Sequence, residues 1–161
     1  MPLGKTIQIY IPDGNPRSIK IADITSRTVQ AILLPRPNLE YAITRKELHK
    51  VGIYFLINND SDEEKPIVYI GEAEDCQLLL KQQHKTKDFW NTALVITSKT
   101  DYFTKTHVKF LEWHCYSEIE KAGRYLIENS TMPTKPFIPE SIISDLLDNF
   151  DTIKILTSTL G

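Results

Sequence analysis

Hydrophobic and polar residues follow one another along the first fifty positions in the pattern of short β-strands. Residues 6–11 are rich in β-branched and aromatic side chains, and residues 12–16 form a dense turn signal with two prolines and a glycine. Residues 18–21 alternate again, so the pattern predicts a β-hairpin across this turn. Residues 28–34 favour a further strand, after which Asn38 is expected to cap a short helix.

From position 51 onward the apolar runs are longer, and segments with a helical period lie between them. Residues 51–57 and 66–70 predict two strands joined by a polar loop. Asp75 is expected to cap a helix, because apolar side chains follow it at helical spacing. Residues 92–97 predict another apolar strand.

The last third of the chain is predicted to be mainly helical. Thr104 begins a long helix whose apolar stripe advances in steps of three and four, and Gly123 ends it. A short extended piece at residues 124–128 leads into a proline-rich loop, and residues 141–156 predict a final helix. The chain is therefore expected to be of mixed α/β class.

Composition narrows the class of protein. The chain has 161 residues, of which 41% are hydrophobic and 25% charged, which suits one globular domain or one domain with a small appendage. There is no run of about 18 apolar residues and no signal-peptide pattern, so we expect a cytoplasmic protein with no membrane partner. Cys76 and Cys115 are too few for a disulfide framework or a zinc site of two CxxC pairs.

The small net charge of −2 hides a segregated pattern. Residues 1–59 carry eight basic and four acidic side chains, whereas residues 60–75 carry seven acidic side chains and one lysine. Residues 81–109 again have an excess of four positive charges, and the rest of the chain is acidic. Such segregation permits a basic face for a polyanion, although any single lysine is more often simply solvated.

Two tripeptides carry the main functional signal: Gly52-Ile53-Tyr54 and, after fourteen further residues, Tyr69-Ile70-Gly71. This pair, with the order strand, strand, helix, strand, helix, resembles the GIY-YIG endonuclease family over roughly residues 50–135. The resemblance implies a small, mainly antiparallel sheet flanked by helices. We accordingly expect a β-rich extension at residues 1–50, a nuclease-like domain at 51–135, and a helical segment at 136–161 that leads into a further region.

The resemblance also implies a site for the hydrolysis of nucleic acid phosphodiesters, with DNA favoured over RNA. Tyr54 would orient or deprotonate the attacking water, and Tyr69 would support it in a hydrogen-bonded pair. Glu112 would bind one weakly held Mg²⁺ or Mn²⁺ ion, which keeps several of its waters when a single carboxylate holds it. Asn129 would be a polar positioning residue near the phosphate.

The sequence departs from the family at two positions on the helix after Tyr69-Ile70-Gly71. The family's arginine falls at Leu79 and its histidine at Gln83, while His84 is one residue, or about 100° of helix, out of register. A tyrosine with an ordinary pKa of about 10 needs nearby positive charge to act as a base at neutral pH. Substitutes for that charge, and contacts for nucleic acid, are expected among three lysines: Lys81, Lys85 and Lys105.

Each assignment has a structural alternative. The two tyrosines could be ordinary strand residues, Glu112 a boundary carboxylate at the edge of the apolar stripe, and Asn129 a turn residue. At the level of the whole chain, the alternatives to an endonuclease are a catalytically degenerate nucleic-acid-binding module and an interaction scaffold. The missing arginine predicts that cleavage is slow or absent.

Overall fold

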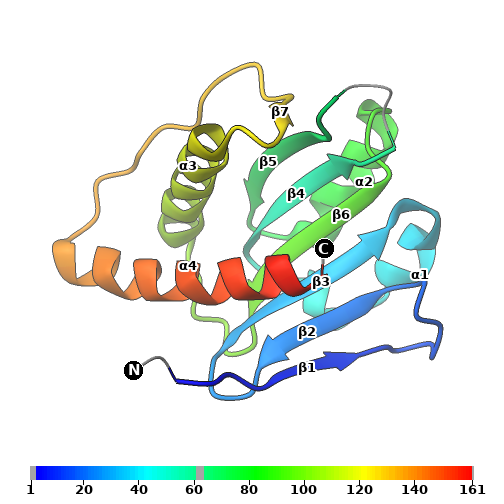
Figure 1. The fold of residues 1–161 in the computed structure, drawn as a ribbon, viewed down its shortest axis with the longest axis horizontal. Coiled ribbons are helices and arrows are strands. Elements are labelled where there is room, and N and C mark those ends of the chain that lie inside the picture. The colour runs from blue at the N-terminus through cyan, green and yellow to red at the C-terminus, as the bar shows by residue number, and fades with distance from the viewer. Residues whose placement is uncertain (1–2, 61–63, 161) are drawn as a thin grey trace.

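The structure, a computed structural model, describes residues 3–60 and 64–160, and in these ranges seven strands form one sheet. The strands are β1 (Ile7–Tyr10), β2 (Lys20–Ile24), β3 (Val29–Pro35), β4 (Gly52–Asn58), β5 (Ile67–Ala73), β6 (Thr92–Ser98) and β7 (Leu126–Ile127). Their order across the sheet is β1-β2-β3-β6-β4-β5-β7 (Figure 1). Neighbouring strands are antiparallel except β5 and β7. The expected mixed fold with a mainly antiparallel sheet is confirmed.

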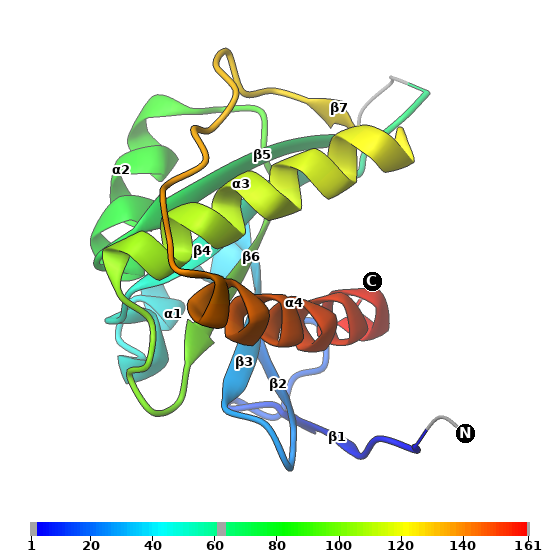
Figure 2. The same ribbon diagram turned by 90° about the vertical axis from the view of Figure 1, so that its left-hand side faces the viewer.

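Helices cover both faces of this sheet. The α-helices are α1 (Leu39–Ala42), α2 (Cys76–Thr86), α3 (Lys105–Ala122) and α4 (Glu140–Leu160), and two 3₁₀ turns, η1 (Arg36–Asn38) and η2 (Lys46–Leu48), flank α1. Figure 2 shows α3 and α4 on the opposite side of the sheet from α1 and α2. Because side chains alternate along a strand, β4 contributes Ile53 and Phe55 to the core under α3 and Tyr54 and Leu56 to the core under α2.

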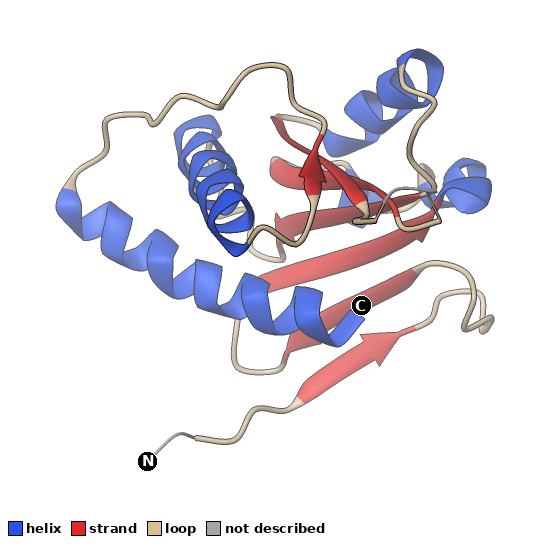
Figure 3. Ribbon diagram, turned by 45° about the horizontal axis from the view of Figure 1, so that its top comes forward, coloured by secondary structure: helices blue, strands red, loops and turns tan. Residues whose placement is uncertain are grey.

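The N-terminal fifty residues continue the same sheet. The predicted hairpin is present as β1 and β2, and β3 pairs with β6 along its whole length, from Val29 opposite Ser98 to Pro35 opposite Thr92. Helix α4 lies across β2 and β3 (Figure 3) and buries Leu146 in the shared core. The C-terminal helix therefore packs on strands of the N-terminal segment, which in turn pair with the central strand β6.

The predicted caps at Asp75, Thr104 and Gly123 are confirmed, whereas the final helix runs past its predicted end at residue 156, to Leu160. The Asp75 side chain accepts hydrogen bonds from the amides of Gln77 and Leu78, at 3.0 and 3.4 Å. Thr104 caps α3 through the amide of His107, and Gly123 ends that helix with a left-handed φ of 66°. Local capping chemistry thus fixes where both helices begin and where α3 ends.

The expectation for Asn38 is confirmed in position only: it is the N-cap residue of α1. Its side chain makes no capping hydrogen bond, and the α-helix that follows ends at Ala42. The helical region begins earlier, with extended Pro35 before a 3₁₀ turn that has a proline in its first turn. The Thr44 hydroxyl then donates to the Tyr41 carbonyl at 2.7 Å, so this carbonyl is satisfied without a further helical turn.

Two carboxylates of the predicted acidic run, Asp62 and Glu63, lie outside the described residues. Within residues 3–60 and 64–160, no helix is both long enough and apolar enough to cross a membrane.

Candidate functional site

The two tyrosines of the motif lie side by side on one face of the β4–β5 hairpin. The register sets Tyr54 opposite Gly71 and Leu56 opposite Tyr69. The two tyrosine rings stack with their centroids 6.2 Å apart and their planes inclined by 28°. The prediction that paired strands bring these tyrosines together is confirmed, but the expected hydrogen bond between them is not among the hydrogen bonds of the described residues, in which the partner of the Tyr54 hydroxyl is Gln83.

The two glycines of the motif are required by close packing. A Cβ atom at Gly71 would collide with the ring and hydroxyl of Tyr54, which lie directly over this residue. A Cβ atom at Gly52 would collide with the backbone carbonyl of Ile96 on β6. The ring of Tyr54 therefore crosses β5 at the one position where that strand has no side chain in its way.

The hydroxyl of Tyr54 is held by a neutral partner. Tyr54 is only 3% exposed, and its hydroxyl accepts a hydrogen bond of 3.1 Å from the side-chain amide of Gln83 on α2. Burial, and then the neighbouring Tyr69, raise the pKa of Tyr54 far above its ordinary value. At neutral pH this phenol stays protonated, which disfavours a role as a general base.

Leu79 and Gln83, where the sequence departs from the family that it resembles, lie on the same face of α2. Leu79 packs against the core that contains Tyr54, and Gln83 makes the hydrogen bond just described. His84 faces elsewhere, since its Nδ1 atom accepts a 3.0 Å hydrogen bond from Arg36. The helix register thus directs His84 to Arg36 and not to the side of Gln83, as the sequence predicts.

A pair of carboxylates lies on the opposite face of the hairpin, under α3. The pKa of Glu112 is raised to about 7, chiefly by burial and then by the charge of Glu72 on β5, while Lys109 and Lys105 lower it. One carboxylate oxygen of Glu72, Oε2, is buried and has no hydrogen-bond partner among the described residues. A buried carboxylate oxygen without a partner is unfavourable, and the Lys105 ammonium lies 3.5 Å from the other oxygen, Oε1, and not from this one.

These carboxylates fit a hydrated divalent cation. Carboxylate oxygens are the ligands that Mg²⁺ and Mn²⁺ prefer, and Mg²⁺ is commonly held through one or two of them. Such an ion at Glu112 and Glu72 would provide a partner for the orphaned Oε2 atom. Among the described residues no third histidine, cysteine, aspartate or glutamate completes a cluster, so water and phosphate would supply the remaining ligands.

Asn129 binds the backbone of the second tripeptide. Its Oδ1 atom accepts from the amide of Ile70 at 3.0 Å, and its Nδ2 atom donates to the carbonyl of Ile70 at 2.8 Å. It comes two residues after β7, so its side chain continues the pairing of that strand along the edge of β5. This contact gives Asn129 a structural role, and its contact with a phosphate stays a prediction.

The three predicted nucleic-acid lysines are in different environments. Lys81 and Lys85 are exposed on α2. Lys105, at the start of α3, lies 3.5 Å from Glu72 and 3.7 Å from Glu74. Only the first two are thus left without a carboxylate within ion-pair distance among the described residues.

Arg36 is a residue that the sequence analysis missed. Its guanidinium donates to the carbonyls of His84, Asp88 and Trp90, at 2.9, 3.3 and 2.9 Å, and lies 4.3 Å from the centre of the Trp90 ring. It therefore binds the C-terminal end of α2 and the turn that follows. These contacts join residues about fifty positions apart, so no local sequence pattern indicates them.

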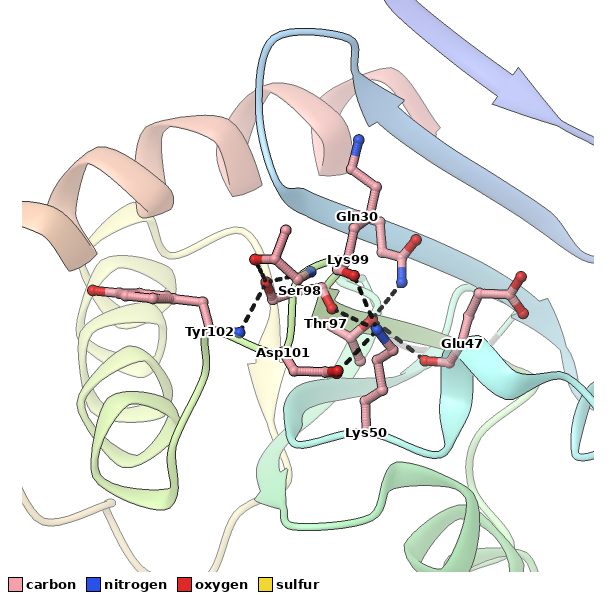
Figure 4. Close-up of polar contacts among 9 residues, drawn as sticks. Gln30, Glu47, Lys50, Thr97, Ser98, Lys99, Asp101 and Tyr102 are labelled. Atoms are coloured by element: carbon pink, nitrogen blue, oxygen red, sulfur yellow. Dashed lines mark hydrogen bonds and ion pairs between the residues drawn. The ribbon is translucent and has the colours of Figure 1, made fainter.

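A second set of contacts from the N-terminal segment fixes the loop that leads into α3 (Figure 4). The buried amide of Gln30 donates to the Thr97 hydroxyl at 3.0 Å. The ammonium of Lys50 donates to the carbonyls of Ser98 and Lys99 and pairs with Asp101 at 3.1 Å. This loop precedes α3, the helix that carries Glu112. The N-terminal segment therefore supports the end of α2 through Arg36 and the start of α3 through Lys50.

No protein-family model, curated protein or solved structure matches this chain significantly. The functional interpretation therefore rests on the motif residues and on the geometry described above.

Proposed function

We propose that this chain is a GIY-YIG-type module that binds nucleic acid, with duplex DNA favoured, and hydrolyses it very slowly or not at all. The two tripeptides and the exposed lysines of α2 support the binding. Phosphate contacts by lysine supply most of the affinity of non-specific DNA binding.

The observation that carries the proposal is the hydrogen bond from the Gln83 amide to the Tyr54 hydroxyl. In the family that the sequence resembles, an arginine and a histidine occupy the positions of Leu79 and Gln83. Two neutral side chains there give no charge to stabilise a tyrosinate or a reacting phosphate. Loss of one such electrostatic contact typically slows an enzyme by about 10²–10³-fold.

Binding is tested with a DNA duplex of random sequence, titrated with the protein over a range of salt concentrations. We expect log Kd to rise linearly with the logarithm of the salt concentration, by about 0.9 for each phosphate contact. The double variant Lys81→Ala/Lys85→Ala should flatten this dependence, whereas Lys154→Ala on α4 should not. Absence of binding at low salt would contradict the proposal and favour an interaction scaffold.

A second candidate is a metal-dependent endonuclease, and the carboxylate pair Glu72 and Glu112 favours it. A divalent ion, when bound there, would neutralise charge on the phosphate oxygens. Mn²⁺ binding, followed by electron paramagnetic resonance, should be weak in the wild-type protein and lost in Glu112→Gln and Glu72→Gln. Glu120→Gln, at an exposed position of the same helix, is the matched control. Equal Mn²⁺ binding by all four proteins would remove the pair from the metal site.

A further inference from the structure

Lys87 lies beside the tyrosine pair and belongs to none of the sites assigned above. Its ammonium is 4.4 Å from the centre of the Tyr69 ring, and this ring stacks on Tyr54. Lys87 is half-buried, and the ion pairs among the described residues do not include it. Its charge is therefore held at the tyrosines without being neutralised by a carboxylate.

The helix register explains why Lys87 reaches this position. Leu79, Gln83 and Lys87 follow one another in steps of four residues, so each is rotated by only about 40° from the one before. Lys87 is the C-cap of α2, and its amide donates to the carbonyl of Gln83 at 2.9 Å. It thus continues, by one more turn, the face on which the family places its arginine and histidine.

The other cations near the site are directed elsewhere. Lys81 and Lys85 are each two residues from Gln83, so they lie about 200° around the helix, away from the tyrosines. Lys105 is paired with Glu72, and the guanidinium of Arg36 is occupied by backbone carbonyls.

The segment around Lys87 is fixed in place. Arg36 binds the carbonyls of His84 before it and of Asp88 and Trp90 after it. The side-chain amide of Asn58 also donates to the carbonyl of Phe89 at 2.7 Å. A cation on a supported turn loses less conformational freedom when it binds a ligand than one on a mobile loop.

From this geometry we infer that Lys87 binds a backbone phosphate of the nucleic acid at the Tyr54–Tyr69 pair, in place of the cation missing at Leu79. The inference rests on the proposed function and names the residue that anchors the strand at its site. Lysine binds phosphate as a point charge and lacks the planar fork of arginine, so Lys87 provides binding without the bidentate grip.

The test compares Lys87→Met with Lys154→Met in the same salt titration with duplex DNA. Lys154 is the matched control, since its ammonium also lies over an aromatic ring, 5.5 Å from the centre of Phe150, but on the other face of the sheet. Lys87→Met should weaken binding roughly five- to tenfold at 0.1 M salt and reduce the salt slope by about 0.9. Lys87→Arg, which keeps the positive charge, should retain both the wild-type affinity and the wild-type salt slope. A purely structural role of Lys87 would not require this result.

The outcomes separate the two proposals. If the wild-type protein does not bind DNA, the proposed function and this inference both fail. If it binds and Lys87→Met has the same affinity and salt slope as Lys154→Met, the inference alone is wrong. Thermal melting of each variant checks folding. Lys87→Gln keeps a polar side chain and provides a second variant, with the same expected loss of DNA affinity and of salt slope.

Discussion

The two faces of the β4–β5 hairpin satisfy their polar groups in opposite ways. Under α2, the hydroxyl of Tyr54 has the neutral amide of Gln83 as its partner, and apolar side chains surround it. Under α3, Glu72 has a buried oxygen without a partner and the pKa of Glu112 is raised to about 7. The tyrosine hydroxyl thus has a neutral partner, whereas on the carboxylate face one oxygen of Glu72 pairs with Lys105 and the other is buried without a partner among the described residues.

Packing alone therefore accounts for the two tripeptides. The tyrosines and glycines of the two tripeptides have packing roles that do not depend on catalysis. The packing of Glu72 is less favourable, because it pairs with Lys105 through one oxygen and leaves the other buried without a partner among the described residues.

Gly71→Ala should have the largest effect on stability, because it breaks the tyrosine face. The added methyl group would occupy the space of the Tyr54 ring. We expect the free energy of unfolding to fall by up to about 3 kcal/mol, the range for overpacked cores. Denaturant unfolding measures this change, and Gly4→Ala, where a Cβ atom would meet nothing within 4 Å, should leave it unaltered. If Tyr54→Leu does not recover part of the loss in the double variant, the collision is not its cause.

Asn129→Ala should reduce stability less than Gly71→Ala does. Asn129 binds the edge of β5, which both faces of the hairpin share. The variant removes both hydrogen bonds to the backbone of Ile70 and leaves the amide and carbonyl of that residue without these partners. We expect a loss of about 1–2 kcal/mol in the same unfolding measurement. Ser130→Ala, at the exposed neighbouring position, serves as control. Equal stability of the two variants would show that Asn129 does not support the strand.

Glu112→Gln should have the smallest effect on stability, and this effect should depend on pH. Because the pKa of Glu112 is raised from 4.5 to about 7, the folded protein holds a proton that the unfolded chain releases in this window. Wild-type stability should therefore fall as the pH rises from 4.5 to 7, whereas the variant lacks this titration. The variant should be more stable above pH 7, by less than about 1 kcal/mol after solvent screening, and equal to wild type below pH 4.5.

Melting temperatures across this pH range test the prediction for Glu112. Glu120→Gln should follow the wild-type curve, since this carboxylate is exposed on the same helix. Parallel curves for wild type and Glu112→Gln would mean that the carboxylate face does not hold Glu112 in its protonated form.

Much of the fold is predictable because its signals are local. The turn between β1 and β2, the caps at Asp75 and Thr104, and Gly123 at the end of α3 each depend on a few neighbouring residues. The pairing of the two tyrosines follows from two strands joined by one loop. Such features need no knowledge of the rest of the chain.

The remaining features depend on distant segments. The pairing of β3 with β6 and the contact of Arg36 with the end of α2 join parts of the chain far apart in sequence. Glu72 and Lys87 did have signals that the sequence analysis did not use. Glu72 directly follows Gly71, so strand alternation directs it to the face opposite Tyr69, and Lys87 continues the helical face of Leu79.

The central claim is that two neutral residues on α2 separate binding from hydrolysis, and nicking of supercoiled plasmid DNA with Mg²⁺ tests it most directly. The wild-type protein should nick very slowly or not at all, and Leu79→Arg/Gln83→His should raise the rate on the order of 10²-fold. The melting temperature is measured alongside, because Leu79 is partly buried and arginine there carries a burial cost. Glu112→Gln should abolish the gain. Rapid nicking by the unmodified protein that disappears in Glu112→Gln would contradict the account.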